Sequence, residues 1–195
     1  MIDNKSQVHI SHKPICLVKT HLCSQTVDTN TNFYQIYKND DNFFIKGDNS
    51  KFSYINGNPL INGIKELLSN EKPFANTDIY DKFLTDSGSK YFVKWLLSKD
   101  CDHEKWIQLS SKGEIISYMT MTHNEFNNKP SFFISELFVC KKFRGSGYCL
   151  NMLKFAENRA IEQEKEQIVL NCFAANEKAY KTYLKYGFVP FQRSV

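Results

Sequence analysis

The sequence contains no apolar run that approaches the roughly 18 residues needed to cross a membrane as a helix. Its first residues, Met1 to Lys5, are polar and contain no apolar core of a secretion signal. We therefore expect a cytoplasmic protein that does not associate with membranes. The 195 residues are typical of one globular domain, with two small domains as the alternative. Of these residues 42% are hydrophobic and 24% charged, which excludes a disordered or collagen-like chain.

The six cysteines form no metal-binding pattern. None belongs to a CxxC pair, and no group of cysteines and histidines has the spacing of a zinc finger. We therefore expect no metal site. We interpret the cysteines as reduced thiols of a cytosol-like compartment rather than as a disulfide framework.

The charge is nearly balanced, since 25 Lys and Arg residues stand against 21 Asp and Glu residues and leave a net charge of +4. This excess is too small and too dispersed to indicate nucleic-acid binding, which needs a concentrated basic surface. A small ligand with several negative charges fits better, because it needs only a local positive site.

The chain divides into two unequal halves. Residues 1–100 are weakly patterned and rich in Asn, Asp and Lys. The elements predicted there are a polar linker over 24–32, short strands over 42–46 and 51–55, and helices over 59–68 and 79–97.

The second half, residues 104–195, is strongly patterned. It predicts strands over 105–109, 115–122, 131–139, 167–173 and 188–193, and helices from the 144–147 loop to about residue 163 and over 176–186. The first two strands form an antiparallel hairpin, and the third is almost continuously apolar, as a buried strand is. In the first helix, one buried face is predicted to hold Leu150, Leu153, Ala156 and Ala160.

The loop between the strand over 131–139 and the following helix is the most informative stretch. Its glycines, Gly145 and Gly147, let backbone N–H groups turn towards a ligand. The helix N-terminus adds unsatisfied donors and a partial positive charge. Lys141, Lys142 and Arg144 add fixed charge nearby. Such a loop either only starts the helix or binds a pyrophosphate.

Two common phosphate motifs do not fit this loop. No Gly-Lys-Ser/Thr is present, which excludes a nucleoside-triphosphate P-loop. The spacing Gly145-x-Gly147-x-x-Leu150 lacks the third glycine of a dinucleotide fingerprint. The preceding strand also follows an antiparallel hairpin, whereas that fingerprint needs an early strand of a parallel sheet.

The residues that flank the loop resemble the GNAT superfamily of acetyl-CoA-dependent N-acetyltransferases. Its signature, Arg/Gln-x-x-Gly-x-Gly/Ala after a strand that ends in Leu-x-Val, is similar to the run from Arg144 to Cys149 after Leu137-Phe138-Val139. The chain departs from the signature at Cys149, where the family has Gly or Ala. A second motif, Asn-x-x-Ala-x-x-x-Tyr-x-x-x-Gly-Phe, is matched by Asn176, Ala179, Tyr183, Gly187 and Phe188.

The resemblance covers about residues 104–190 and implies an α+β (mixed α/β) fold. The sheet would be mixed but largely antiparallel, flanked by helices, with two splayed parallel strands that form the acetyl-CoA cleft. The acetyltransferase domain would cover 41–195, after an N-terminal extension over 1–40 that is an extra strand or an arm.

One strand of the family pattern is missing at the C-terminal end. Members usually have two strands after the Gly-Phe, and only one fits here. The other is absent, is supplied by the N-terminal segment, or is exchanged from a second subunit. An exposed sheet edge would also suit a homodimer.

The resemblance further implies the binding residues. Backbone groups of Leu137, Phe138 and Val139 would bind the pantetheine arm and the thioester carbonyl, and Asn176 would contact the pantetheine side. The pyrophosphate would lie on the loop residues Arg144, Gly145, Ser146, Gly147, Tyr148 and Cys149.

For catalysis, Tyr183 aligns with the tyrosine that is the general acid in many members. A tyrosine of ordinary pKa, about 10, can donate a proton to the departing CoA thiolate; otherwise Tyr183 only packs. Glu136, in an otherwise apolar strand, is the preferred candidate base, unless it faces solvent or pairs with a lysine. Glu125 and His123 are weaker candidates. A covalent route through Cys140, Cys149 or Cys172 is not expected, because no histidine lies near them in sequence.

The expected function is acetyl transfer from acetyl-CoA to a primary amine of a small molecule, such as a polyamine, an amino sugar or an amino-acid derivative. Residues 134–139, together with Asn176, Glu177 and Tyr183, are loosely similar to spermidine/spermine acetyltransferases. The alternatives are acetylation of a protein lysine or N-terminus, and a CoA-binding module without catalysis.

Overall fold

The computed structural model describes residues 14–27, 32–39, 42–46, 103–110 and 115–192. The strand predicted over 51–55, the helices predicted over 59–68 and 79–97, and Cys101 lie outside these residues. No helix in the described ranges is long and apolar enough to cross a membrane.

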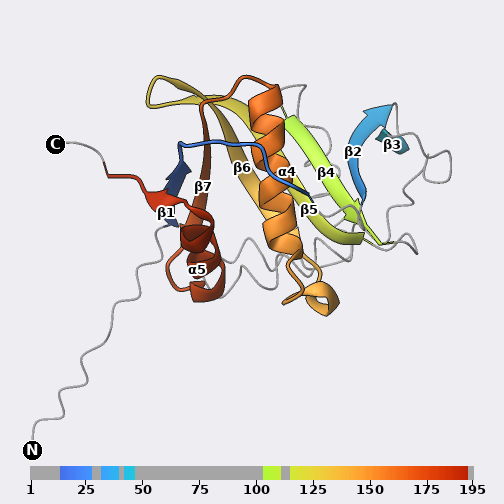
Figure 1. The fold of residues 1–195 in the computed structure, drawn as a ribbon. Coiled ribbons are helices and arrows are strands. Elements are labelled where there is room, and N and C mark those ends of the chain that lie inside the picture. The colour runs from blue at the N-terminus through green and yellow to red at the C-terminus, as the bar shows by residue number, and fades with distance from the viewer. Residues whose placement is uncertain (1–13, 28–31, 40–41, 47–102, 111–114, 193–195) are drawn as a thin grey trace, which may run out of the picture.

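The described strands form one mixed sheet (Figure 1) in the order β3-β2-β4-β5-β6-β7-β1-β8. They are β1 (Pro14–Lys19), β2 (Asn32–Asn39), β3 (Asn42–Lys46), β4 (His103–Leu109), β5 (Ile115–Phe126), β6 (Lys129–Val139), β7 (Gln167–Phe173) and β8 (Val189–Pro190). Neighbouring strands are antiparallel except for β6 and β7, which are parallel. The predicted mixed, largely antiparallel fold with one parallel pair is confirmed.

Some strand boundaries differ from the prediction for local reasons. β5 extends four residues beyond its predicted end, because the hairpin turn is only Asn127 and Asn128, with φ of 52° and 59°. Asparagine tolerates this left-handed conformation, which a two-residue hairpin turn requires. β8 is shorter than the predicted 188–193, although Phe191 N–H beyond it still donates to Cys16 O of β1 at 2.9 Å. β3 matches the strand predicted over 42–46, and its neighbour in the sheet is β2.

The N-terminal segment supplies a strand to the sheet. β1 lies between β7 and β8, with Pro14 opposite Phe173 and Val18 opposite Val189. Of the three possibilities considered for the missing strand, the structure therefore shows the second, in which the N-terminal segment supplies it. Leu17 of β1 is fully buried, so this strand is part of the core.

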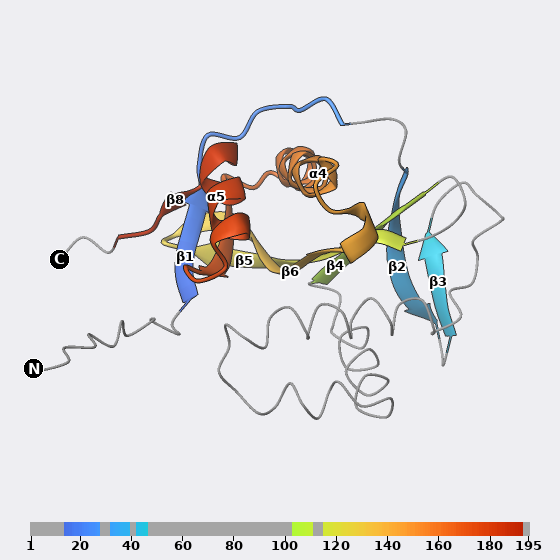
Figure 2. The ribbon, with the colours of Figure 1, turned by 90° about the horizontal axis from the view of Figure 1, so that it is seen from below.

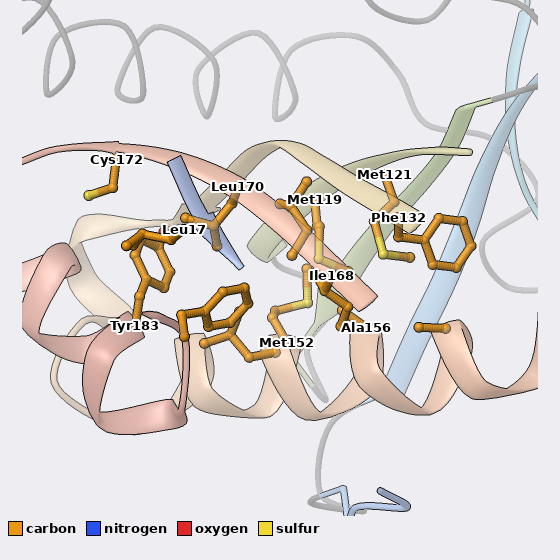
Figure 3. Packing of buried hydrophobic residues seen from close by; sticks show 14 residues of the cluster. Leu17, Met119, Met121, Phe132, Met152, Ala156, Ile168, Leu170, Cys172 and Tyr183 are labelled. Atoms are coloured by element: carbon orange, nitrogen blue, oxygen red, sulfur yellow. The ribbon is translucent and has the colours of Figure 1, made fainter. Parts of the chain in front are cut away.

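Helices α4 (Tyr148–Glu162) and α5 (Glu177–Tyr186) lie on the same face of the sheet (Figure 2). The apolar residues on the buried face of α4 are Met152, Leu153, Ala156 and Ala160. This face packs on sheet residues that include Met119, Met121, Phe132, Ile168 and Leu170 (Figure 3). The prediction that Leu150 shares this face is wrong, since Leu150 is 37% exposed. At 3.6 residues per turn it lies about 100° from the middle of that face.

Residues 20–27, called the strap below, follow β1 and cross the outer side of α4 (Figure 2). Asn158 of α4 fixes the strap by bonding the backbone of Gln25 twice. Its Oδ1 accepts from Gln25 N–H at 2.7 Å, and its Nδ2 donates to Gln25 O at 2.8 Å. The Asn158 side chain thus bonds both the N–H and the C=O of one strap residue, as a neighbouring strand does in a sheet.

A buried carboxylate joins β1, the strap and both helices. Glu157 of α4 accepts hydrogen bonds from Lys19 Nζ at 2.9 Å, from Cys23 N–H at 2.9 Å and from the Tyr186 hydroxyl at 2.6 Å. Burial acts to raise the pKa of Glu157, but these hydrogen bonds and the Lys19 charge outweigh it and hold the pKa below its usual range. Glu157 therefore stays ionised and paired.

Candidate active site

The parallel strands β6 and β7 separate part-way along their length. They pair only from Ser131 opposite Gln167 to Ile134 opposite Leu170. Beyond that point β6 stays with β5, and β7 stays with β1. The last residues of the two strands therefore splay apart, as predicted, and their facing backbone edges are not used in the sheet.

The strand alternation decides which backbone groups of β6 face β7. Cys140 N–H donates to Ile116 O of β5 at 2.9 Å. In an antiparallel ladder the bonded positions alternate, so the backbone groups of Phe138 also point to β5. Those of Leu137 and Val139 point to the splayed edge. The expectation that Phe138 offers backbone groups at this edge thus needs correction, whereas the backbone groups of Leu137 and Val139 are directed towards it.

The loop after β6 has the geometry of an anion-binding helix start. Gly145 and Gly147 have φ of 79° and 84°, in the left-handed region that favours glycine. α4 begins at Tyr148 without a side-chain cap and without an acidic residue in its first turn. The first N–H groups of this 15-residue helix are thus not capped by a side chain, and the helix dipole adds partial positive charge there.

Aromatic and basic side chains fix the loop between β6 and α4. Arg144 Nε donates to Val139 O at 2.9 Å, and its guanidinium carbon lies 5.9 Å from the centre of the Phe138 ring. Phe143 packs edge-to-face on Tyr148 at 5.9 Å between ring centres. Lys141 and Lys142, in the short 3-10 helix η2 (Lys141–Phe143), are exposed.

A β-bulge in β6 decides where Glu136 lies. Ile134 is opposite Met121 and Glu136 is opposite Thr120, so Ser135 is an additional residue between two regular pairs. Before the bulge, Phe132 and Ile134 belong to the core under the helices. After it, Leu137 packs on that core, and Glu136 lies on the opposite face of the sheet with Phe138.

On that opposite face, Glu136 lies near hydroxyl groups. Its Oε2 accepts a hydrogen bond from Ser135 Oγ at 2.6 Å. Tyr118 is fully buried, and its hydroxyl lies 2.6 Å from Thr120 Oγ1. Burial, with the negative charge of Glu136 in addition, raises the pKa of Tyr118, which therefore stays a neutral donor. Sequence reasoning missed Tyr118, Thr120 and Ser135, because only the bulge brings them beside Glu136.

Asn176 and Tyr183 follow the end of β7. Asn176 precedes α5, makes no side-chain cap bond to it, and donates its backbone N–H to Phe173 O at 2.9 Å. Tyr183 is 8% exposed and packs in the core near Leu17 and Cys172 (Figure 3). Its ring lies edge-to-face on Phe188 at 6.0 Å. The helix and glycine stop predicted here are confirmed, since α5 ends at Gly187 with φ of 109°.

A family model now decides the identification. The model of the acetyltransferase (GNAT) family matches residues 63–188, more than half of the chain. The chain belongs to the GNAT acetyltransferase family. It is thus an acetyl-CoA-dependent N-acetyltransferase, in agreement with the splayed strands and the glycine loop. A comparison with curated protein sequences finds no match.

Solved structures share the fold of this GNAT acetyltransferase at low sequence identity. A candidate acetyl transferase from Pyrococcus furiosus has a TM-score of 0.55 at 23% identity, over 72% of this chain and 95% of its own. An aminoglycoside acetyltransferase from an uncultured soil metagenomic sample, in complex with trehalose, has a TM-score of 0.54 at 14% identity, over 86% and 94%. A transcriptional regulator from Bacillus halodurans C-125 has a TM-score of 0.55 at 19% identity, over 72% and 93%. These similarities show the fold alone.

The weaker candidate bases of the GNAT enzyme lie away from Glu136. His123 Nε2 is 3.2 Å from Glu104 Oε1, and the His123 ring packs edge-to-face on Phe132, on the helix-covered face. Glu125 is exposed beside the hairpin turn. The geometry brings neither of them to Glu136.

The cysteines of the motif segments do not have the surroundings of nucleophiles. Burial raises the pKa of the Cys149 thiol to about 11. Cys172 is buried, with its Sγ 3.5 Å from Phe173 O. The five cysteines within the described residues are free thiols, and those residues contain no group of His, Cys, Asp and Glu able to hold a metal ion.

Proposed function

We propose that this GNAT enzyme transfers the acetyl group of acetyl-CoA to the primary amine of a small molecule. Polyamines, amino sugars and amino-acid derivatives are the acceptor classes. The observation that carries the proposal is the position of Glu136. Its half-buried carboxylate stands at the point where β6 and β7 separate, on the sheet face opposite α4. A carboxylate there attracts an ammonium ion and accepts its proton.

The residues on the α4 side fit the CoA part of the cosubstrate. The uncapped first turn of α4, with the positive-φ glycines before it, offers backbone N–H groups to a pyrophosphate. Nothing lies within 4 Å of the position that a Cβ would take at Gly145 or Gly147, so the loop is open to a ligand. The splayed edge of β6 offers backbone groups of Leu137 and Val139 to the pantetheine amides.

The proposed chemistry moves protons through two side chains of this chain. Glu136 takes one proton of the acceptor ammonium, which exposes the nitrogen lone pair. The nitrogen attacks the thioester carbonyl carbon of acetyl-CoA, so that a C–N bond forms and the C–S bond breaks. The Tyr183 hydroxyl gives a proton to the departing sulfur, and the second proton that the nitrogen loses returns to the Tyr183 oxygen. General acid–base groups of this kind each contribute typically about 10²–10⁴-fold to the rate.

Two observations support a small acceptor. The loose similarity of residues 134–139, Asn176 and Tyr183 to spermidine/spermine acetyltransferases favours polyamines. One solved structure with a similar fold is an aminoglycoside acetyltransferase, and for this reason we include amino sugars in the test panel.

The experiment is transfer of labelled acetyl groups to a panel of polyamines, amino sugars, amino acids and lysine peptides. Isothermal calorimetry with acetyl-CoA runs in parallel. Rapid labelling of a small amine, with loss of turnover but retained acetyl-CoA binding in Glu136→Gln, is the expected result. Labelling of lysine peptides alone would show that the acceptor is a protein rather than a small molecule. Binding of acetyl-CoA without any transfer would favour a non-catalytic CoA-binding module instead.

A further inference from the structure

We infer that Ser135 is a positioning residue for acetyl transfer, because it places Glu136 on the acceptor face and holds one oxygen of its carboxylate. This inference rests on the proposed function, in which Glu136 receives the proton of the amine. Ser135 itself acts through Glu136 and needs no contact with either substrate.

The first observation is the change of face that Ser135 causes. Side chains of a strand alternate between the two faces, so Glu136 should share the face of Phe132 and Ile134. That face lies under the helices. The additional residue at Ser135 shifts the alternation by one, which puts Leu137 on the core and Glu136 on the other face. If β6 were regular at Ser135, with no bulge, the carboxylate would point into the hydrophobic core.

The second observation is the hydrogen bond between Ser135 and Glu136. The hydroxyl has one hydrogen to donate, and two acceptors lie near it. Glu136 Oε2 is at 2.6 Å and Thr120 O is at 3.5 Å, so the hydrogen goes to the carboxylate. Such short bonds to an ionised oxygen are about twice as strong as neutral ones.

This bond distinguishes the two carboxylate oxygens. Oε2 is held by Ser135, and Oε1 has no hydrogen-bond partner among the described residues. Oε1 is therefore the atom that receives the proton of the amine. Tyr118 is the titratable group that faces Glu136 from β5, and it stays neutral, so it does not compete for the acceptor cation.

The test compares Ser135→Ala, which removes the donor, with Ser135→Thr, which keeps a hydroxyl. Ser131→Ala is the matched control, since Ser131 lies on the same strand where β6 still pairs with β7. Its hydroxyl donates to Lys129 O and accepts from Gln167 Nε2. Two readouts are needed: steady-state kinetics over a pH range, and the ¹³C resonance of the Glu136 carboxyl carbon at pH 7, assigned with Glu136→Gln.

Ser135→Ala is expected to move the carboxyl resonance and to lower kcat/KM for the amine about tenfold. The KM for acetyl-CoA stays unchanged. The acid limb of the kcat/KM profile moves to higher pH, because a carboxylate that loses a donor binds protons more tightly. In Ser135→Thr the carboxyl resonance, the kcat/KM for the amine and the acid limb are expected to be those of the wild type. Ser131→Ala is expected to leave the same three quantities unchanged.

The inference is overturned if the resonance in Ser135→Ala is that of the wild type. It is equally overturned if the kinetic effect of Ser135→Ala is a uniform loss without a shift of the acid limb, as for a purely structural residue. If the wild type acetylates no amine, the proposed function fails, and the resonance still decides whether Ser135 holds the carboxylate.

Discussion

At the scale of single residues, the site depends on a few backbone conformations and hydrogen bonds. Gly145 and Gly147 adopt left-handed φ angles that other residues avoid, and the loop residues were recognisable from their spacing alone. Glu136 was proposed from the sequence as a carboxylate in an apolar strand, and its catalytic role stays a prediction. Its hydrogen bond from Ser135 and its place opposite Thr120 could not be predicted, because a bulge depends on the pairing of two strands and leaves no pattern in one of them.

Gly147→Ala tests the loop. The residue has φ of 84° and open space around it, so alanine introduces backbone strain rather than a clash. We expect a cost of about 1–2 kcal/mol at this position and at least a tenfold higher Kd for acetyl-CoA, measured by calorimetry. Gly187→Ala, at φ of 109°, is the control: it should lose similar stability and keep the affinity. An unchanged Kd in Gly147→Ala would contradict the assignment of the loop.

Tyr183→Phe tests the general acid. The ring packs on Phe188 in the core, and phenylalanine preserves that packing while it removes the hydroxyl. Turnover should fall by about 10²-fold or more. The acetyl-CoA affinity should change little. Full activity in this variant would leave Tyr183 with the packing role alone.

At the scale of secondary-structure elements, the described strands and helices of the second half were predicted well, whereas of the described first-half strands only β3 was predicted. β7 has its predicted bounds, because a short apolar strand between two helices carries its own pattern. β1 and β2 were not assigned, since their partners are distant in sequence: β1 pairs with β7, and β2 with β4. The position of β1 follows from tertiary contacts that local periodicity does not contain.

Asn158→Ala tests the attachment of the strap to α4. The substitution removes both hydrogen bonds to the backbone of Gln25. A loss of about 1–3 kcal/mol is expected, at about 1 kcal/mol for each bond. Amide hydrogen exchange at Gln25 should accelerate, while exchange in the middle of α4 stays slow. Asn124→Ala is the control, since Asn124 Oδ1 only accepts from the adjacent Glu125 N–H.

At the scale of the whole molecule, two buried carboxylates connect the helices to the rest of the fold. Glu157 binds Lys19, Cys23 and Tyr186. Glu104 of β4 accepts from Arg159 at 2.8 and 3.0 Å and from Trp106 at 3.0 Å. Burial alone would raise the pKa of the Glu104 carboxyl. The hydrogen bonds from Arg159 and Trp106 and the charge of Arg159 outweigh this effect, so the pKa lies below its usual range.

The lowered pKa values of Glu104 and Glu157 determine how the free energy of unfolding depends on pH. In the unfolded chain both carboxylates protonate near the ordinary value of about 4.3, and in the folded chain only at lower pH. Their contribution to the free energy of unfolding is therefore present above that value and is lost as the pH falls through the lower folded pKa values. Denaturant titrations at pH 7, 5, 4 and 3 should show this decline.

Glu157→Gln should be less stable than the wild type by about 3 kcal/mol at pH 7, because Lys19 remains buried without its partner. The difference should shrink towards pH 3. A constant difference over the pH range would show that the charge of Glu157 is not what stabilises the fold.

The place of β1 between β7 and β8 has a consequence for synthesis of the protein. Pro14 leaves the ribosome long before Phe173, its neighbour in the sheet. At about 5–20 residues per second, this strand waits roughly 10–30 seconds for its partners. β7 gains its neighbour on this side of the sheet only by pairing with β1, a strand made long before it. The nascent chain therefore completes this part of the sheet only after β7 has emerged and met the waiting strand.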